Sequence, residues 1–254
     1  MNLKKIIISV LALTLMVSCA TTGKGQKNRQ YDCSERLETA KTRMAKKNFT
    51  DAIRILEDVK YQCGGNPLMD SVYYLGGTAN LKLKQYTDAR IEFERLIREY
   101  PRSPLASESQ YRIAQMVYLQ SNPFNRDQTE TKEAVRLLSD FLEQNSENNY
   151  VDSAKHYLSL SMEKLAAKEF NNARFYRKQG ENEAALVYFR SLLSQYPDSK
   201  YTSEALVGIV EVLIDLKRGE DARDVLGEID ESKLNEELKQ RFELAKSKLG
   251  GSAE

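Results

Sequence analysis

Apolar residues recur at helical spacing along almost the whole chain beyond residue 33. Separated by a break at Asn48, the first two apolar stripes comprise Leu37, Ala40, Met44 and Ala45, then Ala52, Ile53, Leu56 and Val59. Spacings of three and four residues belong to one face of an α-helix, and the alternation typical of a strand is convincing nowhere. The pattern therefore predicts an all-α protein.

Helix-breaking residues recur along the chain and divide this pattern. The breaks are Gly64 to Pro67, Tyr100-Pro101, Ser121 to Pro123, Asn145 to Asn149, Gly180, Tyr196-Pro197 and Gly219. Helices of about 12–20 residues joined by short connections form antiparallel hairpins. We therefore expect a series of helical hairpins.

Two of the hairpins share a register of small, aromatic and proline residues. The first copy comprises Tyr73, Gly77, Ala89, Phe93 and Pro101, and the second comprises Ala173, Tyr176, Ala185, Phe189 and Pro197. This order matches the 34-residue tetratricopeptide unit, in which small residues allow two helices to approach and an aromatic residue fills the space between hairpins. Proline ends the second helix because it lacks an N–H and clashes with the preceding turn.

Weaker copies extend the repeat along the chain. The anchor alanines are Ala52, Ala89, Ala134, Ala185 and Ala222, and their spacing widens in the middle. Longer helices, or a loop inserted around residues 122–131, would account for the wide spacing. The chain is thus predicted to form an all-α solenoid of about five tetratricopeptide-like hairpins over residues 34–249, followed by a tail at 250–254. The alternative is a generic helical bundle.

The N-terminal segment has the layout of an export signal. Lys4 and Lys5 precede an apolar run from Ile6 to Val17 that is too short to span a bilayer. Ser18-Cys19 follows and resembles the bacterial lipobox, which predicts a signal peptide at 1–18 and acylation, typically with palmitate, of Cys19. An ordinary cleaved signal is the alternative. Residues 19–33 are expected to form the lipidated N-terminus and a flexible tether, and Ala20 after the cysteine resembles outer-membrane sorting signals.

Charge and cysteine content bear on the partners and on the compartment of the protein. Without Lys4 and Lys5, 36 basic residues face 37 acidic ones, which offers no global attraction to nucleic acid or to anionic lipid. Besides Cys19, the exported chain has Cys33, just before the first helix of the first predicted hairpin, and Cys63, just after its second helix. An antiparallel hairpin brings these ends together, so we predict a disulfide, with two unpaired thiols as the alternative.

No catalytic or metal-binding motif is evident. His156, the sole histidine, falls off the apolar stripe of its predicted helix, and no phosphate loop or nucleophile elbow is found. We therefore predict no enzyme activity, no cofactor and no metal site. Solenoids of this kind work through an extended concave surface, so binding is the expected function.

The combination of lipobox, polar tether and about five repeats resembles the BamD family, lipoproteins of the outer-membrane β-barrel assembly machinery. Similar motifs are the run from Leu165 to Pro197 and the junction Tyr100-Pro101-Arg102-Ser103-Pro104. The resemblance implies a lipid-anchored scaffold on the periplasmic face of the outer membrane. It also implies that N-terminal repeats bind unfolded outer-membrane proteins, the clients, and that C-terminal repeats hold the barrel-forming partner.

Aligning the repeats by their alanines suggests where these two surfaces lie. The client-peptide groove is predicted to comprise Lys41, Met44, Tyr74, Thr78 and Leu81, a mixture that can stack on an aromatic side chain and pair with a terminal carboxylate. The partner-docking surface is predicted to comprise Phe170, Arg174, Arg177 and Tyr188. Tyr188 occupies the place where the family often has a docking arginine, so Arg174 or Arg177 is expected to take that part.

Other functions remain open at this stage. A periplasmic cell-envelope or division scaffold with tetratricopeptide repeats is the main alternative, although that family carries a coiled coil that is not evident between Cys19 and Ser34. A nutrient-capture lipoprotein would need large insertions that this chain lacks. An enzyme has no positive support.

Overall fold

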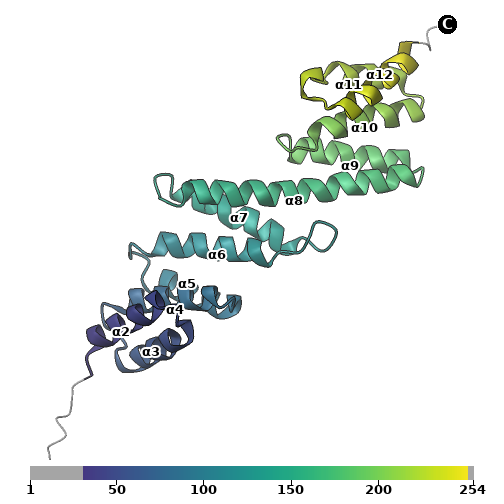
Figure 1. Cartoon of the computed structure of the whole chain (residues 1–254). Coiled ribbons are helices and arrows are strands. Elements are labelled where there is room, and N and C mark those ends of the chain that lie inside the picture. Colours follow the sequence, from purple (N-terminus) through teal and green to yellow (C-terminus); the bar gives the residue numbers. More distant parts are fainter. Residues whose placement is uncertain (1–30, 251–254) are drawn as a thin grey trace, which may run out of the picture.

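The computed structural model describes residues 31–250. It is an elongated stack of helices whose two ends lie far apart (Figure 1). The predicted signal peptide, Cys19, nearly all of the tether and residues 251–254 lie outside the described residues.

The described residues contain helices and turns and no strand. In chain order the helices are α2 (Cys33–Ala45), α3 (Phe49–Gln62), α4 (Met69–Lys82), α5 (Tyr86–Glu99), α6 (Ala106–Gln120), α7 (Thr129–Gln144), α8 (Val151–Lys178), α9 (Asn182–Gln195), α10 (Thr202–Asp215), α11 (Gly219–Gly227), the 3₁₀ turn η1 (Glu231–Lys233) and α12 (Glu236–Gly250).

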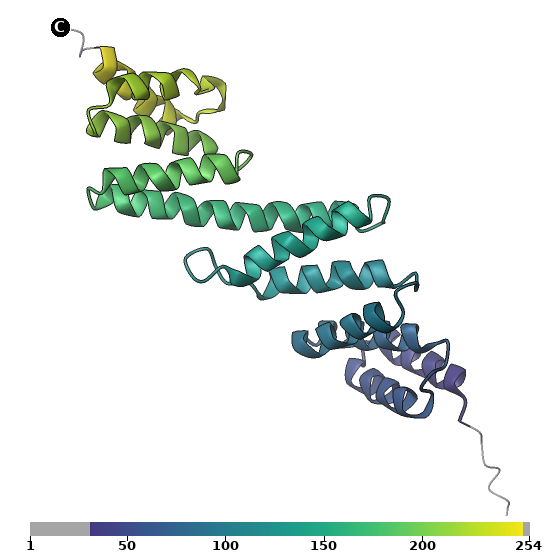
Figure 2. The same cartoon turned by 180° about the vertical axis from the view of Figure 1, so that it is seen from behind.

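Each helix packs mainly on the helices before and after it in the chain. Helices α2 to α11 form five antiparallel hairpins, and α12 packs on α10 and α11 at the C-terminal end of the stack, as the opposite view also shows (Figure 2). The predicted all-α solenoid of five hairpins is confirmed. Contacts between neighbouring repeats alone are the defining feature of such a fold.

The irregular middle of the solenoid has two causes, which the sequence pattern offered as alternatives. Helix α8 is 28 residues long, twice the length of α9 at 14 residues, so its N-terminal half extends past α9. Between α6 and α7, the chain makes a longer connection over residues 121–128. The longer connection widens the sequence spacing from Ala89 to Ala134, and the long α8 widens the spacing from Ala134 to Ala185.

Buried phenylalanines explain the small residues of the repeat. The five anchor alanines are fully buried. A Cβ atom at Gly77 would lie 2.7 Å from the ring of Phe93, and one at Gly208 would lie 2.7 Å from the ring of Phe189. Only glycine lets these helices pack so closely on the rings. The sequence pattern identified Gly77 but missed Gly208.

Four of the five hairpin turns use one backbone geometry. Lys47, Lys84, Gly180 and Lys217 each follow the first helix of a hairpin with a positive φ of 57–80°. A left-handed residue there lets the chain reverse and satisfies the last carbonyls of the helix. The exception is the α6–α7 connection, which is longer.

A disulfide closes the first hairpin. Cys33 begins α2 and Cys63 follows α3, and the structure joins their sulfur atoms with the Cα atoms 6.1 Å apart. Between these helices, the hydroxyl of Tyr31 and the guanidinium of Arg36 both donate to Asp58. The N-terminal end of the solenoid is thus held by a covalent link and a polar cluster.

Candidate functional site

The predicted client-groove residues lie on the first helices of the first two hairpins. Lys41 and Met44 are on α2, and Tyr74, Thr78 and Leu81 are on α4. Lys41 is exposed and pairs with Glu38 at 2.7 Å, while Met44 is half-buried one turn away. An exposed ion pair within one helix contributes little to stability, so the Lys41 ammonium remains available to a ligand.

The three α4 residues are more enclosed than expected for an open groove. The Tyr74 ring packs against Phe93 with centroids 6.0 Å apart, and Leu81 packs on the buried cluster formed by α5 and α6. The Thr78 hydroxyl oxygen is buried and has no hydrogen-bond partner. Only the outer part of Tyr74 and Leu81 is therefore accessible, because their inner surfaces join the second hairpin to the third.

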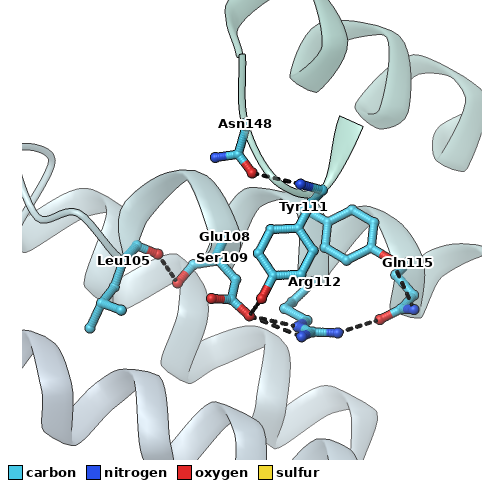
Figure 3. Close-up of polar contacts among 8 residues, drawn as sticks. Leu105, Glu108, Ser109, Tyr111, Arg112, Gln115 and Asn148 are labelled. Atoms are coloured by element: carbon cyan, nitrogen blue, oxygen red, sulfur yellow. Dashed lines mark hydrogen bonds and ion pairs between the residues drawn. The ribbon is translucent and has the colours of Figure 1, made fainter. Parts of the chain in front are cut away.

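A polar and aromatic cluster continues this surface into the third hairpin (Figure 3). On α6, Glu108 accepts hydrogen bonds from the Arg112 guanidinium at 2.9 Å and from the Tyr150 hydroxyl at 2.5 Å. The Arg112 guanidinium also lies 5.1 Å from the Tyr150 ring centroid and 5.4 Å from that of Tyr111. The two rings stack on each other with centroids 4.9 Å apart, so the Arg112 cation lies beside the stacked pair and contacts both rings.

Electrostatics keep this cluster charged. Burial by itself would raise the pKa of Glu108, but hydrogen bonds from Tyr150, Tyr74 and Arg112 outweigh it and hold that pKa below its ordinary value. Burial, and then the Glu108 hydrogen bond, raise the pKa of Tyr74 well above the ordinary value of 10. The carboxylate and guanidinium are therefore both ionised at neutral pH, and both tyrosines keep their hydroxyl protons.

Sequence reasoning missed this cluster. The pair Glu108 and Arg112 has the ordinary i, i+4 spacing of an exposed helical ion pair, and such pairs are common in this chain. Tyr150 lies 42 residues beyond Glu108. Only the irregular α7–α8 connection brings the two together, and the repeat pattern could not place that connection.

At the C-terminal end, the prediction for Phe170 is wrong. Its side chain is 3% exposed and packs between Phe189 and Tyr201, with ring centroids 6.1 and 4.9 Å away. Phe170 therefore belongs to the core and offers no docking surface. Arg174 is exposed, with its guanidinium 5.7 Å from the Phe170 ring centroid, so it covers the core residue and faces solvent.

Arg177 is engaged within the protein. It forms an ion pair with Glu211 of α10, and the Arg241 guanidinium of α12 also binds Glu211, at 2.8 Å. Burial alone would raise the pKa of Glu211, but Arg241 and Arg177 lower it below the ordinary value. Arg177 thus links the fourth hairpin to the fifth, and replacing it would disturb the fold as well as any docking surface.

Tyr188 lies at the edge of an exposed aromatic cluster. It stacks on Tyr176 with centroids 5.2 Å apart, and Phe175 contacts Tyr176 edge-on. Phe175 and Val187 are 57% and 65% exposed. We call Arg174, Phe175, Val187 and Tyr188 the α8–α9 patch; it combines a free guanidinium with exposed apolar side chains, the composition of an interface anchor.

Other kinds of site are not evident in the described part of the chain. Residues 31–250 contain no group of histidine, cysteine, aspartate or glutamate residues arranged to hold a metal ion. None of the helices described is both long and apolar enough to cross a membrane. His156 is exposed, as its position off the apolar stripe predicted.

Comparisons with known proteins agree with one another. Residues 29–225 match the family YfiO, described as outer membrane lipoprotein. The chain is 26% identical over 221 residues to the outer membrane protein assembly factor BamD of Caulobacter vibrioides, covering 85% of this chain and 72% of that one. It is 27% identical over 252 residues to the putative assembly factor BamD of Aquifex aeolicus, covering 95% and 78%.

Solved structures that resemble the chain are more distant. MamA from Desulfovibrio magneticus aligns with a TM-score of 0.42 at 12% identity, covering 89% of this chain and 99% of that one. YrrB, titled a TPR protein with an unusual peptide-binding site, aligns with a TM-score of 0.40 at 14% identity, covering 77% and 84%.

Proposed function

Because this chain belongs to the YfiO family of outer membrane lipoproteins, we propose that it is a non-enzymatic scaffold for the assembly of outer-membrane β-barrel proteins. The observation that carries the proposal is the family match, which spans the first four hairpins and part of the fifth. Curated relatives, of whose length the alignments cover 72% and 82%, are named outer membrane protein assembly factors. A solenoid that has charged side chains along a surface of its N-terminal half, and the exposed α8–α9 patch in its C-terminal half, suits a protein that holds two partners at once.

Unfolded clients bind the N-terminal half in this proposal. Lys41 supplies an accessible ammonium, Met44 an adaptable apolar side chain, and the outer edges of Tyr74 and Leu81 an apolar wall. Arg112, which lies beside the stacked rings of Tyr111 and Tyr150, extends the groove into the third hairpin. Methionine and aromatic side chains accommodate varied apolar ligands, as a scaffold with many clients requires.

The barrel-forming partner binds the α8–α9 patch at the C-terminal half. Arg174 takes the role of the docking arginine because it has no carboxylate within ion-pair distance among the described residues, whereas Arg177 is paired with Glu211. Phe175 and Val187 replace Phe170 as apolar anchors. Interfaces of this kind concentrate their binding energy in a few aromatic and arginine side chains.

Two double variants test this division. Arg174→Glu with Phe175→Ser should abolish co-purification of the barrel-forming partner and leave crosslinking of client peptides intact. Lys41→Glu with Met44→Ser should weaken crosslinking of client peptides, by about tenfold or more, and leave the partner bound. The matched control for the first variant is Arg190→Glu, an exposed charge on α9. The matched control for the second is Lys46→Glu, an exposed charge at the C-terminal end of α2. If each double variant loses both activities while it remains folded by circular dichroism, the solenoid works as one undivided surface and the proposal fails.

Anchoring at the outer membrane rests on Cys19. Its acylation would hold the scaffold durably, since each buried methylene contributes about 0.8 kcal/mol. Cells fed a labelled fatty acid should therefore label the wild-type protein and not the Cys19→Ala variant. A labelled variant, or a wild type without label, would show that the lipid is absent or attached elsewhere.

A further inference from the structure

Half-buried cations of this protein are almost all paired with carboxylates. Among the described residues, nine lysine and arginine side chains are half-buried. Seven of them form ion pairs with aspartate or glutamate: Arg36, Lys60, Arg90, Arg112, Arg177, Arg218 and Arg241. The other two, Lys164 and Lys168, have no carboxylate within ion-pair distance in residues 31–250.

These two lysines lie one helical turn apart on α8, beside the α6–α7 connection. The Lys164 ammonium donates to the Ser121 hydroxyl at 2.6 Å and lies 4.6 Å from the Tyr118 ring centroid. The Lys168 ammonium donates to the backbone carbonyl of Arg126 at 3.2 Å. An ammonium group has three donors, so both lysines keep hydrogen-bonding capacity for a ligand.

The surroundings of Lys164 make an anionic ligand favourable. Burial lowers its pKa, which shows that part of its hydration has been removed without a compensating charge. Close to Lys168, Asp127 is bound to the start of α7 through the Thr129 backbone, and hydrogen bonds from Thr129, followed by the Lys168 charge, lower its pKa. The corner therefore carries two cations and one carboxylate that already caps a helix.

Exposed apolar side chains occur in the elements that form this corner. Leu119 lies in the last turn of α6, Phe124 lies in the α6–α7 connection, and Leu160 precedes Lys164 by one turn of α8; they are 48%, 37% and 36% exposed. The connection emerges below the middle of α8 in both views of the molecule (Figures 1 and 2). Apolar groups around a desolvated charge are the arrangement of an interface, whose polar contacts gain strength as water is excluded.

We propose that Lys164 and Lys168, with Leu119, Phe124 and Leu160, form a docking site for an acidic segment of a partner protein that carries carboxylates flanked by large apolar side chains. This site, which we call the α6–α8 corner, goes beyond the proposed function because it lies between the client groove and the α8–α9 patch. Charge complementarity selects the occupant: neither ammonium group is within ion-pair distance of a carboxylate among residues 31–250, and the nearby Asp127 carboxylate is already hydrogen-bonded to Thr129. The three apolar side chains favour a peptide over a small hydrophilic ion.

Peptide binding to the full-length lipoprotein in detergent tests this proposal. The probes are short fluorescent peptides with two glutamates placed around Phe-Leu, and matched peptides with glutamine at both positions. The acidic peptide should bind more tightly than its glutamine match by about tenfold at physiological salt, and Lys164→Gln with Lys168→Gln should remove that preference. Lys164→Arg with Lys168→Arg should retain it, and the control Lys155→Gln with Lys132→Gln should leave it unchanged.

Chemical footprinting gives a second readout that does not depend on the variants. Acetylation of the lysines in the wild-type protein, followed by mass spectrometry, should show Lys164 and Lys168 protected by the acidic peptide and Lys155 unprotected. The proposal is overturned if acidic and glutamine peptides bind equally, or if the Lys164→Gln, Lys168→Gln variant keeps the preference. It is also overturned if glycerol phosphate protects these lysines and the acidic peptide does not, because the corner would then bind a lipid headgroup.

Discussion

Single residues set how closely the helices of this solenoid approach. Gly76 and Gly77 are neighbours in α4, but their surroundings differ. A Cβ atom at Gly77 would meet three atoms of the Phe93 ring within 2.9 Å, whereas one at Gly76 would meet the flexible end of Glu92 at 3.2 Å. The fully buried Phe93 ring has little room to move aside.

This contrast predicts different outcomes for two alanine substitutions. Alanine gains about 1 kcal/mol over glycine in a helix interior, while overpacking a core costs about 1–3 kcal/mol. Gly77→Ala should therefore lower the melting temperature relative to Gly76→Ala, measured by circular dichroism on the two purified variants. A Gly77→Ala protein as stable as Gly76→Ala would mean that Phe93 yields easily.

Individual residues also differ in how well the sequence predicted their positions. Gly77, Phe93 and the anchor alanines were placed correctly because each repeat needs small and aromatic residues at fixed positions. Phe170 was misplaced because a helical register shows which residues share a face, and α8 has neighbours on more than one side. Its partner Tyr201 lies in the α9–α10 connection, which the register does not describe.

Helices of unequal length create the features that distinguish this solenoid from a regular array. Because α8 is twice as long as α9, its N-terminal part packs on α7 and α6 rather than on α9. Tyr150, at the start of α8, reaches Glu108 of α6 through this arrangement. The sequence predicted that the middle is irregular, but contacts such as this one depend on the exact path of the chain between α7 and α8.

The Glu108 cluster predicts a pH-dependent link between the second, third and fourth hairpins. The folded-state pKa of Glu108 is lowered, so its ionised form contributes stability above the ordinary pKa of 4.5 and loses it as pH falls through the folded value. Glu108→Gln should therefore destabilise the protein at pH 7, by about 1–3 kcal/mol for a charge with several donors.

Urea unfolding at several pH values checks this link. The difference between wild type and Glu108→Gln should be constant near neutral pH and shrink below about pH 4.5. Glu99→Gln is the matched control, because Glu99 forms an exposed pair with Arg95 on a single helix. A difference that does not change with pH would assign the effect of Glu108→Gln to packing rather than to charge.

Across the whole molecule, the main packing contacts join neighbouring hairpins, so each hairpin is stabilised by the hairpins next to it. The two end hairpins therefore need additional stabilising contacts, because each has a neighbouring hairpin on one side only. At the N-terminal end, Cys33 and Cys63 are joined; at the C-terminal end, α12 buries Leu238, Phe242 and Ala245 against the last hairpin.

Two substitutions, one at each end of the solenoid, test whether a loss of stability stays local to the hairpin where it arises. Closing a loop of about 30 residues contributes roughly 3–4 kcal/mol in the chain-entropy model, so Cys33→Ser with Cys63→Ser should loosen the first hairpin. Hydrogen exchange should quicken in α2 and α3 and stay unchanged in α10 to α12, whereas Phe242→Ala should produce the reverse pattern. Thiol titration of the denatured, unreduced protein should find neither cysteine free. If the double cysteine variant exchanges faster along all hairpins equally, the solenoid unfolds as one cooperative unit, and the client and partner surfaces would be coupled through the fold.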